Sequence, residues 1–251
     1  MSKAPNITTP VGSFGKGVKG SITLNFSTSG GANCDVACRH HPLATGEGAT
    51  RACYAVHVEK LKPSVNVNLT RKESAGFAAT CNAMATELRK RAERGDSFPW
   101  ARLSAFGSVP QPATLTDADK VAFGELLDVL ASIDAPVHFP VESLAKVFAY
   151  GDMAQRRGIA VRLSLQSDAA ALNAATANLP VSWVAGERGQ SFAEKMADAR
   201  STAKARKDAT GRNVVICPAV VATLARKGRK VSCGECTACA NASIDVCYPL
   251  H

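Results

Sequence analysis

Strand-like and helix-like segments alternate along most of the chain. Residues 21–26 alternate polar and apolar side chains, which is the period-two pattern of a β-strand. Residues 72–94 have helical spacing and end at Gly95, a residue typical of the position just past a helix. The same patterns predict further strands at 100–106, 136–141, 159–165, 181–185 and 214–216, and further helices that start near residue 116 and span 143–157, 168–178 and about 191–207.

About six strand–helix units predict an α/β protein with a parallel sheet and right-handed crossovers. A full eight-fold barrel usually takes ~250 residues by itself. We therefore expect a partial (βα)6-type barrel over residues 1–216. The alternation stops at residue 217, so residues 217–251 are interpreted as a Cys-rich, metal-supported C-terminal extension.

Composition adds two features to this picture, a net charge of +9 and nine cysteines among 251 residues. The N-terminus has no apolar leader, and no stretch approaches 18 apolar residues, so we expect a cytoplasmic protein without a membrane partner. Thiols stay reduced in the cytoplasm, which favours metal ligands over disulfides. Residues 195–230 contain ten Lys or Arg and two Asp, a net charge of +8, which indicates either a polyanionic partner or a solvated helix face.

The first set of cysteines follows the first predicted strand. It comprises Cys34, Cys38 and Cys53. Loops at the carboxyl ends of parallel strands build the active sites of α/β barrels. Three thiolates on such a loop suit a 4Fe-4S cluster with one iron open to a small molecule, while His40 or His41 would complete a Cys3His zinc site instead.

The second set lies in the C-terminal segment. Cys233, Cys236 and Cys239 form a CxxCxxC run, in which short spacers let successive thiolates converge on one cluster. The fourth ligand is either Cys217, which ends a predicted strand, or Cys247. We favour Cys217; a zinc ribbon built on four of the five is the alternative.

Two further residues carry weaker signals. Cys81 lies within a predicted helix and is expected to be a small core residue. His138 lies on a predicted strand that ends near the expected site, so it is a candidate substrate contact.

The arrangement resembles the radical S-adenosylmethionine (SAM) superfamily, and within it the phage-encoded radical-SAM-like proteins of the gene product 88 type. The likeness rests on the pair Cys34 and Cys38, the Cys-Tyr-Ala at 53–55, and the late Cys-Pro and CxxCxxC of the tail. The common superfamily motif is CxxxCxxC, whereas 14 residues separate Cys38 from Cys53 here.

The resemblance implies two 4Fe-4S clusters, one at the first cysteine set and an auxiliary one at the second. SAM would chelate the open iron, and its reductive cleavage would give a radical that abstracts hydrogen from the substrate. A donor such as flavodoxin or ferredoxin would supply the electron. The resemblance also implies a set of SAM-binding residues: Tyr54, Gly107, Ser108, Glu142, Ser164, Gln166, Ser167 and Gly186.

Our leading hypothesis is a radical SAM enzyme that modifies or isomerises a nucleic acid base or a nucleic-acid-linked group, for instance in phage DNA hypermodification within the host cytoplasm. The basic stretch supports a polyanionic substrate. One alternative is a non-enzymatic zinc or iron–sulfur protein that binds nucleic acid. The other is a radical SAM enzyme that acts on a peptide or small metabolite.

Overall fold

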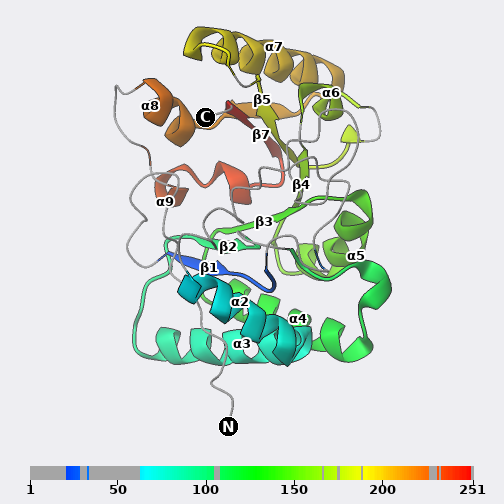
Figure 1. Cartoon of the computed structure of the whole chain (residues 1–251), viewed down its shortest axis with the longest axis vertical. Coiled ribbons are helices and arrows are strands. Elements are labelled where there is room, and N and C mark those ends of the chain that lie inside the picture. The colour runs from blue at the N-terminus through cyan, green and yellow to red at the C-terminus, as the bar shows by residue number, and fades with distance from the viewer. Residues whose placement is uncertain are drawn as a thin grey trace.

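A parallel β-sheet forms the centre of the chain in the computed structural model (Figure 1). The structure describes residues 21–28, 33, 63–104, 108–165, 167–173, 176–187, 189–225, 231 and 233–249. Seven strands of this part pair in the order β1-β2-β3-β4-β5-β7-β6, and every pair is parallel. The strands are β1 (Ile22–Leu24), β2 (Ala101–Leu103), β3 (Val137–Val141), β4 (Val161–Leu165), β5 (Val181–Ala185), β6 (Asn213–Ile216) and β7 (Ile244–Pro249).

Helices alternate with these strands, which confirms the predicted α/β class. The helices are α2 (Pro63–Ala75), α3 (Phe77–Glu93), α4 (Asp117–Ser132), α5 (Leu144–Gln155), α6 (Asp168–Ala171), α7 (Phe192–Thr210), α8 (Pro218–Ala225) and α9 (Cys233–Cys236), with short 3-10 turns η1 (Pro112–Thr114) and η3 (Ala238–Ala240).

Two of the predicted helices differ from the observed ones. The single helix expected over 72–94 is two helices, because Gly76 between α2 and α3 has a φ of +86°, which a right-handed helix does not allow. The helix expected over 168–178 ends at Ala171, after four residues.

Local capping explains several of the helix starts. Thr116 and Asp119 form a reciprocal capping box at α4, and Ser191 and Glu194 form another at α7. The Ser143 side chain accepts a hydrogen bond from the backbone N–H of Lys146 at α5. Each of these helices therefore begins where its sequence predicts.

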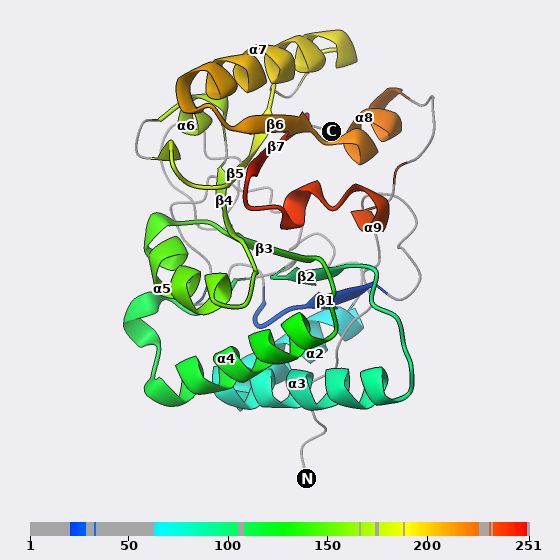
Figure 2. The same cartoon turned by 180° about the vertical axis from the view of Figure 1, so that it is seen from behind.

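The strand order explains why most helices lie on one side. Strands β1 to β5 are neighbours in chain order, so right-handed crossovers all advance in one direction and put their helices on one face. Figures 1 and 2 show α3, α4, α5, α6 and α7 in an arc around this face. We call it the outer face and the opposite one the inner face.

The outer face is apolar and carries the hydrophobic core. Phe139 of β3 packs against Phe123 of α4, with ring centroids 5.7 Å apart, and Phe123 contacts Tyr150 of α5 at 5.3 Å. Trp183 of β5 is also fully buried in this core. Burial of these large side chains fixes which face of each strand meets the helices.

The inner face carries polar side chains instead. Neighbouring strands contribute Thr23, Arg102 and His138 at one level of the sheet, and Arg162 and Tyr248 follow on β4 and β7. Buried polar groups are costly in a protein interior unless they are hydrogen-bonded. The inner face therefore differs in composition from the apolar outer face.

The last strand reverses the direction of the chain across the sheet. β7 returns from the edge strand β6 and inserts between β5 and β6. A right-handed crossover in this reversed direction takes the intervening segment to the inner face, and α8 and α9 lie on the side opposite the arc of helices (Figures 1 and 2).

The predicted C-terminal extension thus ends inside the sheet. Strand β7, which pairs with both β5 and β6, is not among the strands that the sequence pattern predicts. Residues 244–249 of the predicted extension therefore share the sheet of the preceding residues, and the boundary at 216/217 stays a prediction.

Candidate functional site

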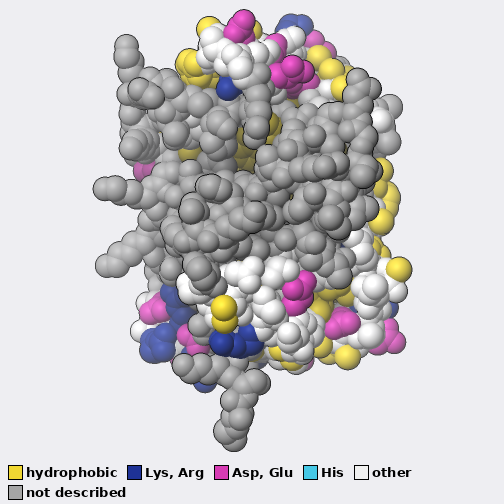
Figure 3. All heavy atoms as spheres, viewed as in Figure 1, with side chains coloured by type: hydrophobic (Ala, Val, Ile, Leu, Met, Phe, Trp, Pro, Cys, Tyr) yellow, Lys and Arg dark blue, Asp and Glu magenta, His cyan; other side chains and the backbone are white. Residues whose placement is uncertain are grey.

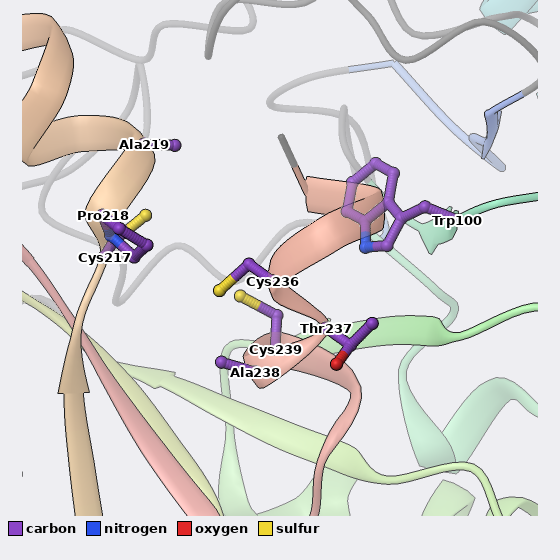
Figure 4. A pocket seen from close by; sticks show the side chains of 8 residues that line it. All are labelled: Trp100, Cys217, Pro218, Ala219, Cys236, Thr237, Ala238 and Cys239. Carbon is purple, nitrogen blue, oxygen red and sulfur yellow. The ribbon is translucent and has the colours of Figure 1, made fainter. Parts of the chain in front are cut away.

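Three of the predicted cluster ligands meet at one cavity on the inner side of the sheet. The cavity is narrow, about 20 Å³. Figure 4 shows the sulfur atoms of Cys236 and Cys239 pointing toward one another, with Cys217 on the facing side. The residues that line the cavity are Trp100, Cys217, Pro218, Ala219, Cys236, Thr237, Ala238 and Cys239.

The two sides of this cavity come from different parts of the topology. Cys217 follows β6 directly, and its backbone N–H donates to the carbonyl of Cys247 at 2.8 Å, which anchors it to the sheet. Cys236 ends α9, and Cys239 lies within η3. The reversed crossover between β6 and β7 therefore carries the CxxCxxC run back toward Cys217.

Cys247, the alternative fourth ligand, lies on the other face. Its side chain is fully buried in the apolar core with Trp183, its neighbour in the register of β5 and β7. Burial raises the pKa of the Cys247 thiol far above its usual range. The next residue, Tyr248, points to the inner face, where its hydroxyl lies 3.0 Å from Cys239 Sγ.

Arg162 holds the segment around Cys239 against the sheet. This fully buried side chain on β4 donates from Nε to the carbonyl of Cys239 at 3.2 Å, and from Nη2 to the carbonyls of Ala238 and Asn241 at 3.4 and 2.8 Å. A fourth hydrogen bond goes to the Val181 carbonyl at 2.8 Å. One guanidinium thereby fixes three residues of the C-terminal segment.

The same surroundings set the acidity of Cys239. Burial raises the pKa of its thiol, while the hydrogen bond with Tyr248 and the charges of Arg162 and Arg102 lower it. The net shift is upward. A thiol in this place is neutral at pH 7, and the two nearby cations would stabilise a thiolate once a metal displaces the proton.

The donor types fit a thiophilic metal, although the side chains are not arranged around one. Thiolates are the ligands of zinc and of iron–sulfur clusters. Within the described ranges, no three His, Cys, Asp or Glu side chains are grouped to hold a single metal ion. Cys233 lies at the start of α9, but its side chain is outside the described part. A cluster at this cavity therefore requires the thiol side chains to change their arrangement.

A second group of predicted residues meets where β2 and β3 end. Ser108 Oγ donates to Glu142 Oε2 at 2.7 Å, and both side chains also bond the ammonium group of Lys146. Lys146 Nζ donates to Ser108 Oγ at 2.9 Å and to the backbone carbonyl of Asn33 at 2.7 Å. The Lys146 side chain is completely buried, so its charge is held by Glu142 and by these neutral acceptors.

The sequence pattern does not mark Lys146 as a candidate site residue. Buried lysines are rare, so composition gives no reason to expect one. The i,i+4 spacing of Glu142 and Lys146 is the one sequence signal, and it more often marks an exposed helix pair. Its contact with Asn33 matters because the next residue along the chain is Cys34.

Three other predicted SAM-binding residues, Ser164, Ser167 and Gly186, lie on or just after β4 and β5. Ser167 uses its hydroxyl to cap α6. The backbone N–H of Gly186 donates to Asp168 Oδ2 at 3.3 Å, and its φ of +84° marks a turn after β5. Ser164 is half-buried on the inner face of β4. Their places at or near the carboxyl ends of β4 and β5 agree with the expected edge of the sheet.

Several predicted site residues lie outside the described residues, so their roles stay predictions. They are the first cysteine set and part of the SAM-binding set: Cys34, Cys38, Cys53, Tyr54, Gly107 and Gln166.

The basic stretch is less exposed than its sequence indicates. Arg206 is buried, and Arg206 Nε and Arg212 Nε both bond the fully buried carboxylate of Asp245 at 2.9 Å. Lys204 pairs with Asp208 on the surface of α7. In Figure 3 cationic and anionic side chains lie side by side on the described surface. Residues 226–230, the most basic run, lie outside the described ranges.

Two single-residue predictions have different outcomes. Cys81 is fully buried in the core, which confirms it as a packing residue, and burial raises the pKa of its thiol. His138 lies on the inner face and is 4% exposed. Burial, followed by the charges of Arg102 and Arg162, lowers its pKa well below the usual value, so its imidazole is neutral at pH 7.

Comparison of the chain with protein-family models, with curated proteins and with solved structures finds no match in any of the three. Among the helices of the described residues, none combines the length and the apolar character needed to cross a membrane.

Proposed function

We propose that this chain is a radical SAM enzyme with a partial α/β barrel, a 4Fe-4S cluster at Cys34, Cys38 and Cys53, and an auxiliary cluster in its C-terminal segment. The observation that carries the proposal is the cavity shared by Cys217, Cys236 and Cys239 on the polar face of an open parallel sheet. An inert structural face would be apolar and would not gather thiols from two distant segments.

The residues of the chain have separable tasks in this proposal. Cys217, Cys233, Cys236 and Cys239 would hold the auxiliary cluster, and Arg162 keeps the Cys239 segment on the sheet. Lys146 fixes the residue before Cys34. When bound, the first cluster and SAM would supply one-electron cleavage of the sulfonium C–S bond and hydrogen abstraction from the substrate.

The proposed substrate is a nucleic acid base or a nucleic-acid-linked group, in the cytoplasm of the cell or of the phage host, with flavodoxin or ferredoxin as electron donor. The net charge of +9 supports a polyanionic partner. Arg206 and Arg212 pair with Asp245, so their charges are not available to a polyanionic partner. The proposed contact is therefore the basic run at residues 226–230.

Iron binding tests the proposal directly. Anaerobic reconstitution of the full chain should give a brown protein with about eight irons if both clusters form. Cys217→Ala should lower this to about four, whereas the core variant Cys81→Ala should leave it unchanged. Cys247→Ala separates the two candidate ligands, since loss of iron there in a folded protein would reverse the assignment. A colourless protein that holds only zinc would reject the proposal.

A further inference from the structure

Three buried polar groups near the cysteine cavity have no hydrogen-bond partner within the part of the chain that the structure describes. They are Arg102 Nε, Ser104 Oγ and His138 Nε2. His138 is 4% exposed and Ser104 is 8% exposed, so water does not replace the missing partners. The large majority of buried polar side-chain atoms in proteins are hydrogen-bonded, and each exception requires an explanation.

The three groups are close together in the sheet. Arg102 and His138 are partners in the parallel register of β2 and β3, so their side chains project from the same face. Ser104 follows β2 directly, and its backbone N–H still bonds the carbonyl of Leu24 at 2.8 Å. Two adjacent strands thus bring a guanidinium, a hydroxyl and an imidazole to one region.

Among the residues that the structure describes, neither Arg102 nor Arg162 forms an ion pair with a carboxylate. Arg162 uses its N–H groups on four backbone carbonyls, which are neutral. The buried acid Asp245 is already paired with two other arginines.

A bound oxyanion would accept the missing hydrogen bonds and would balance the positive charge of the arginines. It would accept from the guanidinium and the hydroxyl, and from the imidazole in its Nε2–H tautomer. Neutral His138 suits this role, because it donates one hydrogen bond without adding a second buried charge. A cationic or apolar ligand would leave the donors unsatisfied.

We propose that Arg102, Ser104 and His138 form a binding site for an oxyanion, a phosphate or carboxylate group of the substrate, on the inner face beside the cysteine cavity. Trp100 connects the two places, since it lines the cavity and its ring centroid lies 6.4 Å from that of His138. The identity of the ligand as substrate rests on the proposed function, whereas binding of the anion itself does not.

Titration calorimetry on the full chain without metal or SAM tests this site. Inorganic phosphate and acetate serve as the two probes, at constant ionic strength. We expect saturable binding of at least one probe. Tighter binding of phosphate would identify a phosphate group as the ligand, and tighter binding of acetate a carboxylate group. Arg102→Met should weaken binding about tenfold or more, since it removes a hydrogen bond to a charged group. Arg94→Met, which removes an exposed arginine from the end of α3, should change nothing.

Other outcomes reject the site. Absence of saturable binding of either probe overturns the proposal, as does equal binding in Arg102→Met and Arg94→Met. Should Arg102→Met fail to fold, Ser104→Ala provides the same comparison, with a severalfold loss expected. A chain that binds phosphate but takes up no iron keeps this site and rejects the radical SAM function. A chain that takes up iron and cleaves SAM but binds no anion does the reverse.

Discussion

The ammonium group of Lys146 donates a hydrogen bond to the backbone carbonyl of Asn33 at 2.7 Å, across 113 residues of sequence. Lys146 lies in the first turn of α5, and Asn33 precedes the first proposed cluster ligand. A completely buried side chain therefore holds the backbone of the residue that precedes Cys34.

Lys146→Met should destabilise the protein and lower its iron content. The substitution leaves the carboxylate of Glu142 without its cation and should cost about 3 kcal/mol of unfolding free energy. Urea denaturation and iron analysis after reconstitution measure the two effects. Lys120→Met, which breaks an exposed pair with Asp117 on α4, is the control and should cost under about 1 kcal/mol. Equal behaviour of the two variants contradicts a positioning role for Lys146.

Asp245→Asn should be the most destabilising conservative change in the C-terminal strand. The Asp245 carboxylate bonds Arg206, Arg212 and the backbone N–H of Val181, so the variant leaves two guanidinium groups without a counter-charge. We expect a loss of about 3–5 kcal/mol in urea denaturation. Asp208→Asn on the surface of α7 should change stability by less than about 1 kcal/mol. A small effect of Asp245→Asn would mean that the ion pairs of Asp245 with Arg206 and Arg212 do not hold β7 in place.

How much of this fold is predictable depends on whether the determining contacts are local. The starts of α4 and α7 follow from capping boxes that span four residues, and the sequence reveals them. The strand β7 depends on pairing with β5 and β6 and on an ion pair between its Asp245 and Arg206 of α7. Because a buried Asp interrupts the run of apolar residues, the hydrophobicity pattern does not predict this strand.

The candidate site shows the same division. Spacing alone identified Cys236 and Cys239 as partners, and a strand end suggested Cys217. The sequence did not reveal the roles of Arg102 and Lys146, because both act through partners from other strands or loops. Side chains whose hydrogen-bond partners lie far away in the sequence leave no local sequence pattern.

Arg162→Met should loosen the segment around Cys239 while leaving the sheet intact. It removes three hydrogen bonds to the backbone of residues 238–241, and we expect local opening to become easier by about 2 kcal/mol. Alkylation of Cys236 and Cys239, followed by mass spectrometry, should then be roughly 30-fold faster. Arg157→Met, which breaks a surface pair with Asp128, is the matched control. Unchanged alkylation rates would exclude Arg162 as the residue that holds this segment.

Lys72→Met should stabilise the protein at neutral pH. Lys72 of α2 is 1% exposed, its Nζ has no hydrogen-bond partner among the described residues, and burial lowers its pKa to about 8. The unfolded chain therefore keeps this proton up to a higher pH than the folded one does. Stability of the native protein should rise between about pH 8 and pH 10.4.

The melting temperature of Lys72→Met measures this effect. At pH 7 the variant should gain about 1–3 kcal/mol, and it should lose the rise in stability above pH 8. Lys90→Met, at an exposed place on α3, should retain the pH dependence of the native protein. A Lys72 variant that is less stable than the native protein at pH 7 would show that the ammonium group has a stabilising partner.

Formation of 5′-deoxyadenosine from SAM by the anaerobically reconstituted and reduced protein tests the central claim most directly. We predict that the native chain forms this product and that Cys34→Ala forms none, while Cys81→Ala, which alters a buried core thiol, retains it. No product from the iron-loaded native chain, or full product from Cys34→Ala, would contradict the assignment of a radical SAM enzyme with its catalytic cluster at Cys34, Cys38 and Cys53.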